Sequence, residues 1–369
     1  MKRLTARNLA CLLLGLILVS TSVHAARLAG LFQAEVDADG RDSVSRDAAL
    51  ALALRDVLVR VTGSTSSANE PAAQALLKQP GRFVEQYRFL DAPARSPDPV
   101  PQVRLWVQFD GVALAREVRR AGLPYWGRER PDVLVWLAVD DRGQRYLVAE
   151  NTRSAAAGER GQGYLAAENN SSAAAAALYR AASRRGLPLT LPLMDLQDQR
   201  AVQFTDVWGG FVGSLEAASQ RYRPQIILLG KLERSRGGSG WRADWTLLGN
   251  GDTQSWTRYA NGLGAGIDQG MAEAAEWLAV QYAAVTADAS VRTLVVEGVQ
   301  SLEDYARVLK YLASLAPVEA VQVARVSGQD VEFNLQLSAA EHNLLQVITL
   351  GKLLRPDGDP SLWRFQLNP

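Results

Sequence analysis

The pattern of apolar and polar residues predicts helices and strands arranged in three successive units. In the first unit, residues 27–125, the apolar side chains of residues 43–62 recur at helical spacing and precede Gly63, which predicts an amphipathic helix with a glycine stop. Residues 103–109 alternate between apolar and polar, which predicts a strand. The other elements expected here are a helix near 71–78, a strand near 83–90 and a helix near 112–122.

The second unit, residues 131–285, is expected to be of α/β type, with a mixed sheet and packed helices. Residues 133–139 (VLVWLAV) are continuously apolar, which is typical of a strand covered on both faces. The Gly249–Asp252 turn predicts a hairpin between two further strands. Residues 150–177, rich in small and polar side chains, are interpreted as a flexible insertion. The remaining expected elements are strands at 188–194 and 225–232 and helices at 173–185, 211–222 and 270–284.

The third unit, residues 291–369, shows the order βαββαβ, which predicts a ferredoxin-like domain. Ser301 and Asp304 are spaced like a capping box at the start of its first helix. Glycines and prolines cluster between residues 122 and 131, and this cluster predicts a boundary between the first two units. The expected fold class is therefore α+β and multidomain.

Composition places the chain among ordinary globular proteins, since 47% of its 369 residues are hydrophobic and 21% are charged. The formal net charge of +1 gives no sign of nucleic-acid binding. Arginine is far more frequent than lysine, and we attribute this to codon usage rather than to a phosphate or carboxylate site.

The first residues have the organisation of a secretory signal peptide. A basic start at Lys2 and Arg3, an apolar run and the Val23–Ala25 ending predict cleavage after Ala25. The run is too short to span a bilayer, so no integral membrane segment is expected after cleavage. Cleavage would remove Cys11, the only cysteine, which fits an exported, periplasmic protein without disulfides.

Several motifs resemble those of a known family. They are the Arg60–Gly63 helix end, the Leu105–Asp110 strand, and the junction motifs Pro124–Gly127 and Arg130–Trp136. These residues look similar to the proteobacterial family catalogued as domain of unknown function 2066. The resemblance implies a Gram-negative envelope protein and brings no activity, cofactor or catalytic residue. The order of units is also loosely similar to periplasmic accessory proteins that assist flagellar or envelope assembly.

No intact catalytic motif is found. His342 is the only histidine after the signal peptide, and we expect it to be solvated at a helix start rather than paired with a nucleophile. Gly237–Trp241 departs from a nucleophile elbow because Trp241 stands at the last glycine position. Gly262–Ile267 departs from a dinucleotide loop at Ile267, and we interpret it as a flexible connection with anion binding as the alternative.

Acidic residues and tryptophans are two further groups of candidate functional residues. Three carboxylate pairs fall in predicted turns, where aspartate is common, namely Asp37/Asp39, Asp140/Asp141 and Asp357/Asp359. Trp126 and Trp208 lie beside glycines in predicted loops. Each tryptophan could anchor a partner if exposed, or join two domains if buried.

The expected function is that of an exported, non-enzymatic binding or assembly accessory of the Gram-negative envelope, with an envelope protein as partner. One alternative is a carboxylate-based hydrolase of cell-wall glycan, which needs two acids facing one cleft. The other alternative is a binder of a small anionic ligand. No catalytic, cofactor-binding or metal-ligating residue is assigned, no cofactor is expected, and the oligomeric state is left open.

Overall fold

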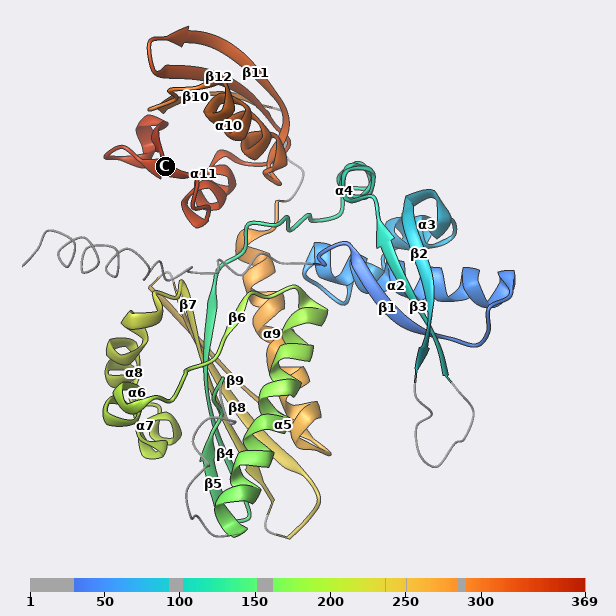
Figure 1. Ribbon diagram of the computed structural model, residues 1–369, viewed down its shortest axis with the longest axis vertical. Helices are drawn as coiled ribbons and strands as arrows, with labels where there is room; N and C mark the ends of the chain where they lie inside the picture. The colour runs from blue at the N-terminus through green and yellow to red at the C-terminus, as the bar shows by residue number, and fades with distance from the viewer. Residues whose placement is uncertain are drawn as a thin grey trace, which may run out of the picture.

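The computed structural model describes residues 30–92, 102–150, 162–235, 237–249, 251–284 and 290–368. It confirms an α+β chain with three sheets in these residues, and Figure 1 shows each sheet with its own helices. The predicted signal peptide, with Cys11 and His24, and the proline-rich stretch 93–101 lie outside the described residues. Within the described part, no helix is long and apolar enough to cross a membrane.

The first unit is a three-stranded antiparallel sheet with helices packed on one face. Helix α2 ends where the sequence predicts, because Gly63 closes it in the left-handed conformation and Asp42 accepts two amide hydrogen bonds at its start. The strand order is β1-β3-β2, so β1 is an edge strand. The elements are β1 (Gln33–Ala38), α2 (Ser43–Thr62), α3 (Pro71–Leu77), β2 (Val84–Ala92), β3 (Gln102–Phe109) and α4 (Gly111–Arg120).

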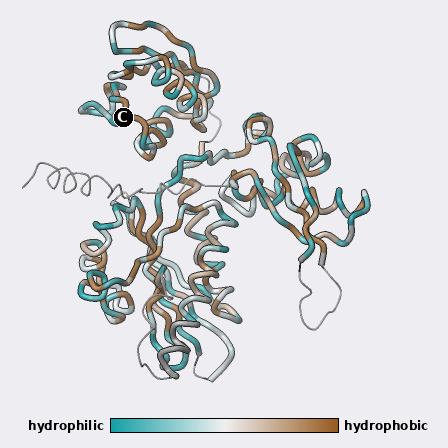
Figure 2. The backbone as a smooth tube through the Cα atoms, in the orientation of Figure 1, coloured by the Kyte–Doolittle hydropathy of each residue, from teal (hydrophilic) through white to brown (hydrophobic). Residues whose placement is uncertain are grey.

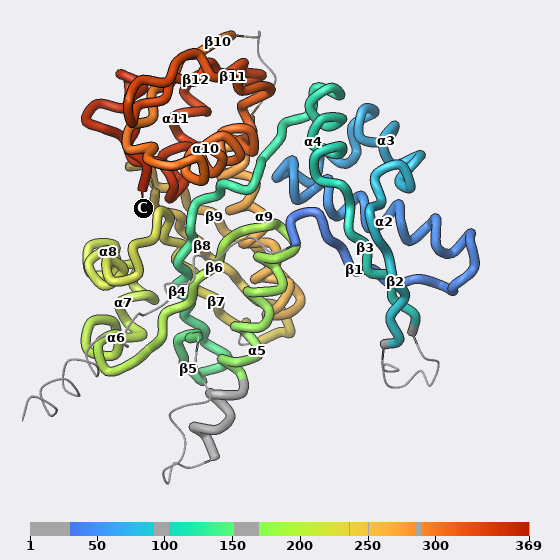
Figure 3. Tube along the Cα trace, turned by 45° about the horizontal axis from the view of Figure 1, so that its top comes forward, coloured from blue at the N-terminus to red at the C-terminus, as the bar shows by residue number. Residues whose placement is uncertain are grey.

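The second unit is a mixed sheet in the order β5-β4-β7-β8-β9, with the short β6 parallel to β4. Helices α5 and α9 cover one face, while the shorter α6, α7 and α8 cover the other (Figures 1 and 3). Figure 2 shows apolar segments along its central strands. The elements are β4 (Val133–Asp141), β5 (Gln144–Leu147), α5 (Gln162–Arg185), β6 (Leu189–Thr190), α6 (Leu196–Ala201), α7 (Phe204–Gly209), α8 (Val212–Ser219), β7 (Ile226–Arg234), β8 (Trp241–Gly249), β9 (Asp252–Ala260) and α9 (Leu263–Tyr282).

Two helices of this unit begin earlier than predicted. Helix α5 starts at Gln162, so most of the expected 150–177 insertion is helical, and residues 151–161 lie outside the described residues. Helix α9 starts at Leu263. The β4–β5 hairpin, α6 and α7 are elements that the sequence pattern did not predict, because they are short and half exposed.

The third unit follows the predicted βαββα order and then adds one strand. The strand order is β11-β12-β10-β14-β13, in which β14 is parallel to β10 and separates it from β13. The prediction missed β13 because it has only three residues. The elements are β10 (Ser290–Glu297), α10 (Leu302–Ser314), β11 (Val318–Ser327), β12 (Asp330–Leu337), α11 (Glu341–Leu350), β13 (Leu354–Pro356) and β14 (Arg364–Leu367).

A buried arginine joins the first two units. Arg130 donates hydrogen bonds to the carbonyl oxygens of Gly127, Trp126, Arg60, Arg185 and Gly186, at 2.8–3.1 Å. Its guanidinium also lies 4.1 Å from the ring centroid of Trp126. Arg60 and Arg185 lie at the carboxyl-terminal ends of α2 and α5, where helix dipoles favour a positive charge. Burial lowers the pKa of Arg130 to about 9, so the group stays charged at neutral pH.

Two glycines allow this close packing. A Cβ atom on Gly63 would lie 2.1 Å from the Cβ of Ala279 in α9, and one on Gly186 would lie 2.7 Å from Cγ of Arg60. Trp126 donates its backbone N–H to Val61, and Tyr125 pairs with Ala284. The glycine- and proline-rich segment between the first two units is therefore packed into the protein rather than extended through solvent.

Replacing Arg130 with methionine is expected to lower the free energy of unfolding by at least about 3 kcal/mol, because several buried carbonyl oxygens lose their donor at once. Arg116→Ala, at an exposed position of α4, serves as the matched control and should change stability by less than about 0.5 kcal/mol. Urea unfolding followed by circular dichroism measures both. Equal stability of the two variants would show that Arg130 does not hold the units together.

Candidate functional site

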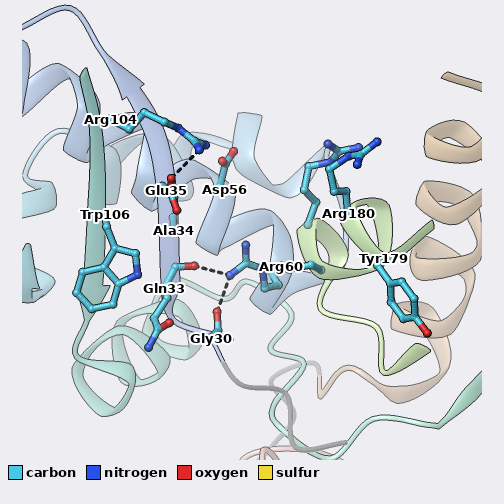
Figure 4. A pocket seen from close by; sticks show the side chains of 12 residues that line it. Gly30, Gln33, Ala34, Glu35, Asp56, Arg60, Arg104, Trp106, Tyr179 and Arg180 are labelled. Carbon is cyan, nitrogen blue, oxygen red and sulfur yellow. Dashed lines mark hydrogen bonds and ion pairs between the residues drawn. The ribbon is translucent and has the colours of Figure 1, made fainter. Parts of the chain in front are cut away.

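A groove of about 640 Å³ lies between the first sheet and helix α5 (Figure 4). Its walls come from two units that Arg130 fixes to each other. The lining residues are Gly30, Gln33, Ala34, Glu35, Asp56, Arg60, Arg104, Trp106, Tyr179, Arg180, Ser183 and Arg184.

The groove follows the free edge of β1. On the outer face of the sheet, Glu35 of β1 lies opposite Trp106 of β3 in the strand register. On the inner side, Asp56 and Arg60 extend from α2. Because lining residues flank β1 on both sides, the edge of this strand lies in the groove, facing α5.

Ion pairs fix the outer wall. The guanidinium of Arg104 lies 2.6 Å from the carboxylate of Glu35 and 3.3 Å from that of Asp37. The guanidinium of Arg88 lies 4.6 Å from the ring centroid of Trp106 and leaves the indole partly exposed. This wall therefore offers an aromatic surface beside charges that already have partners.

Two arginines in the groove make no salt bridge among the described residues, although Asp56 attracts one of them, Arg60, at longer range. Arg60 directs Nη1 to the carbonyl oxygens of Gly30, Leu31 and Gln33, which neutralise none of its charge. Burial lowers its pKa. Arg180, on the exposed face of α5, makes no ion pair or hydrogen bond within the described residues. In contrast, Arg184 pairs with Asp268.

Asp56 is the one carboxylate of the groove without a hydrogen bond or ion pair in the described part of the chain. Its side chain is accessible from the groove, yet the surrounding protein reduces its hydration. This desolvation raises the pKa of Asp56 above its ordinary value, although Arg60, Arg184 and Arg55 act in the opposite direction.

The groove can therefore bind a ligand through charge, backbone hydrogen bonds and one aromatic surface. It contains no histidine or cysteine, and the described residues show no cluster of acidic, histidine or cysteine side chains suited to a metal ion. Its volume lies within the range of about 300–1,000 Å³ that is typical of ligand pockets.

The structure disperses most residues singled out by sequence. His342 is exposed in the first turn of α11, and Gly237–Gly240 belong to the turn between β7 and β8. Asp140 pairs with Arg145, and Asp141 with Arg234, at the end of β4. The remaining predicted acidic positions are Asp37, beside the groove, and Asp39, Asp357 and Asp359, which do not line it.

The Gly262–Ile267 segment is the start of α9 rather than a flexible connection. Gly262 is the N-cap, and Gly266 donates its N–H to the Gly262 carbonyl oxygen. Further along the helix, a Cβ on Gly270 would lie 2.1 Å from the indole of Trp245, so this glycine allows helix and sheet to pack closely. This contact explains Gly270 without a ligand.

The two tryptophans have different environments. Trp126 is 1% exposed and lies between the first two units. It therefore joins two domains, as one of the two alternatives predicted, and it cannot be a surface anchor. Trp208 is partly exposed, and its ring stacks on that of Phe204 with 5.2 Å between the ring centroids. The ammonium group of Lys231 lies 4.8 Å from the centroid of the Trp208 ring. A partner-binding role for Trp208 stays a prediction.

Comparison with known proteins adds one match. Residues 25–127 match the family described as Domain of unknown function (DUF8605). No curated protein and no solved structure matches the chain. The matched residues cover the first unit and end at Gly127, within the junction segment.

This match corrects the resemblance to domain of unknown function 2066, which was wrong. The motifs that suggested it have packing roles: Gly63 ends α2 against Ala279, and Trp126 fills the junction. Such positions are fixed by local geometry, so they can occur in more than one family.

Replacing Asp56 with asparagine is expected to raise the melting temperature at pH 7 by roughly 1–3 °C. The folded-state pKa of Asp56 lies above its unfolded value, so the ionised group opposes folding. The stabilisation from the protonated acid is complete below the unfolded pKa, near 3.8, and is lost as the pH rises through the folded pKa. The difference from wild type should therefore disappear near about pH 3.

Differential scanning fluorimetry across this pH range measures the effect. Asp39→Asn, at an exposed turn position outside the groove, is the control and should leave the melting temperature unchanged. A lower melting temperature of Asp56→Asn at pH 7 would contradict the argument.

Proposed function

We propose that this chain is an exported accessory protein of the Gram-negative envelope that binds an extended, acidic segment of a partner protein in the β1 groove. The observation that carries the proposal is the position of β1. Among the described residues it is an edge strand, and both its flanks line a groove whose opposite wall holds Arg180, which makes no ion pair or hydrogen bond in that part of the chain.

An edge strand favours an extended polypeptide as ligand. One row of backbone N–H and C=O groups on β1 has no strand partner within the described residues. A peptide that adds a strand here would gain main-chain hydrogen bonds, while pockets beside the strand would select its side chains. Trp106 offers an apolar surface on one side of such a strand.

Charge favours acidic side chains on that peptide. Arg180 makes no ion pair in the described residues, whereas Glu35 is already paired with Arg104, and the buried Arg60 is attracted by Asp56. A carboxylate near Arg180 would complete a charge-assisted hydrogen bond. Asp56 opposes a second negative charge, so the preferred peptide places its acid toward α5.

The predicted signal peptide supports a location outside the cytoplasm. The matched family is a domain of unknown function, so the match does not indicate which protein is the partner. The packed junction between the first two units supports binding without large rearrangement, because a preformed groove avoids the cost of ordering its walls.

A carboxylate-based hydrolase of cell-wall glycan is the second candidate. It is favoured by one observation: Glu35 and Asp56 line the same groove, and their surroundings differ, with Glu35 held by Arg104 and Asp56 desolvated. On this alternative, wild-type protein would release soluble fragments from purified peptidoglycan, and Asp56→Asn would not. Chromatography of the soluble products decides this directly.

For the binding function, we expect a fluorescein-labelled peptide of alternating valine and glutamate to bind the chain. Arg180→Glu should lower the affinity for this peptide by about fivefold or more, because an attraction between opposite charges becomes a repulsion. Asp56→Asn should strengthen binding, since it removes a negative charge from the groove. Fluorescence anisotropy at two salt concentrations measures the affinities.

Arg200→Glu is the matched control, because Arg200 is exposed on α6, on the other face of the second sheet. It should bind the peptide as wild type does. Equal affinity for a valine–lysine peptide, or no effect of Arg180→Glu, would argue against the groove as an acidic-segment site.

Export predicts removal of residues 1–25 when the full-length chain is expressed in a Gram-negative host. Intact-mass spectrometry of the periplasmic fraction should find a chain that begins at Ala26. Ala25→Asp should block this processing, because the cleavage pattern requires a small residue. A full-length chain that stays in the cytoplasm would refute the export part of the proposal.

A further inference from the structure

A second cavity, of about 940 Å³, lies between the first unit and the third and is separate from the β1 groove. Its lining residues come from α4 and the junction segment that follows it, and from α10, which is far from both in sequence; Figures 1 and 3 show α4 and α10 on facing sides of the two units. They include Phe32, Tyr125, Arg128, Lys310, Tyr311 and Leu315.

The floor of this cavity is apolar. Phe32, Tyr125 and Leu315 are all buried and line it together. Val112, which also lines it, is 79% exposed, so an apolar side chain is left open to solvent at the start of α4. An apolar ligand body would cover the apolar surface that is still open to solvent, which is favourable because that surface is removed from water.

The rim is cationic. Four basic residues and two acidic ones line the cavity, and one acid, Asp110, is engaged in capping α4. Arg128 and Lys310 make no ion pair or hydrogen bond within the described residues. The guanidinium of Arg128 lies 5.8 Å from the Phe32 ring centroid, so an unneutralised charge stands directly beside the apolar floor.

Tyr311 lines the cavity with its ring. Its hydroxyl is buried against Gly351, which does not line the cavity, so this polar atom belongs to the packing of the third unit.

We propose that this cavity binds an amphipathic anion, a lipid-like molecule whose apolar chain lies on Phe32, Tyr125 and Leu315 and whose single carboxylate or phosphate head group lies between Arg128 and Lys310. The charge of the rim selects an anion, and the apolar floor excludes a ligand that is charged throughout. Because the cavity is shared by two units, the ligand would also tie the third unit to the first.

The test uses the full mature chain and 1-anilinonaphthalene-8-sulfonate, an aromatic amphiphile with one negative charge. Its fluorescence should rise on binding at the cavity. Decanoate and decyl phosphate should displace it, and the uncharged 1-decanol should not. Displacement by decanoate alone identifies a carboxylate head group, displacement by decyl phosphate alone a phosphate, and either supports the proposal.

The double variant Arg128→Glu/Lys310→Glu should weaken binding by at least about tenfold, since two attractions become repulsions. Ala313→Trp, at an exposed lining position, should weaken it by filling the cavity. Lys78→Glu, at an exposed lysine outside the cavity, is the matched control and should bind as wild type does.

Circular dichroism and melting temperature establish that each variant is folded, because the dye also binds partly unfolded chains. Wild-type affinity in both the charge-reversal and the cavity-filling variants would overturn the proposal. Equal displacement by 1-decanol would also overturn it, because the site would then not select an anion.

Discussion

The first two units depend on one buried positive charge that has no acidic partner among the described residues. Arg130 is held by carbonyl oxygens, including those at the ends of α2 and α5, so two helix dipoles replace a carboxylate. Because Arg130 contacts both helix ends, it fixes α2 and α5 relative to each other. Strand β1 packs on α2, so the same contacts set the distance between β1 and α5 and the width of the groove between them.

The sequence predicted elements best where one periodicity ran without interruption. Helix α2 has the predicted bounds, because its apolar stripe and Gly63 agree, and in the structure Asp42 caps its first turn. Helix α9 was predicted too short because the glycines of 262–266 usually weaken helices, whereas Gly266 lies in the helix close to Ala243 and Leu232 of the sheet below. That reason is tertiary, and no local pattern contains it.

The groove could not be predicted in the same way. Asp56 and Arg180 lie on exposed faces of helices, where isolated charges are common and carry no motif. Their meaning comes from the junction that brings α2 and α5 together across β1. Trp126 was recognised as either an anchor or a bridge, and only its burial distinguished the two.

The contact between Gly63 and Ala279 limits how this chain can diverge. Gly63 lies within the segment that matches a family, and Ala279 lies outside it. A larger residue at either position would push the two helices apart. A substitution at one position therefore requires that the residue at the other position leave enough space. The matched domain thus has a surface shaped for a neighbour. A relative that lacks this neighbour would lose the steric reason for glycine at this position, while the left-handed backbone would still favour it.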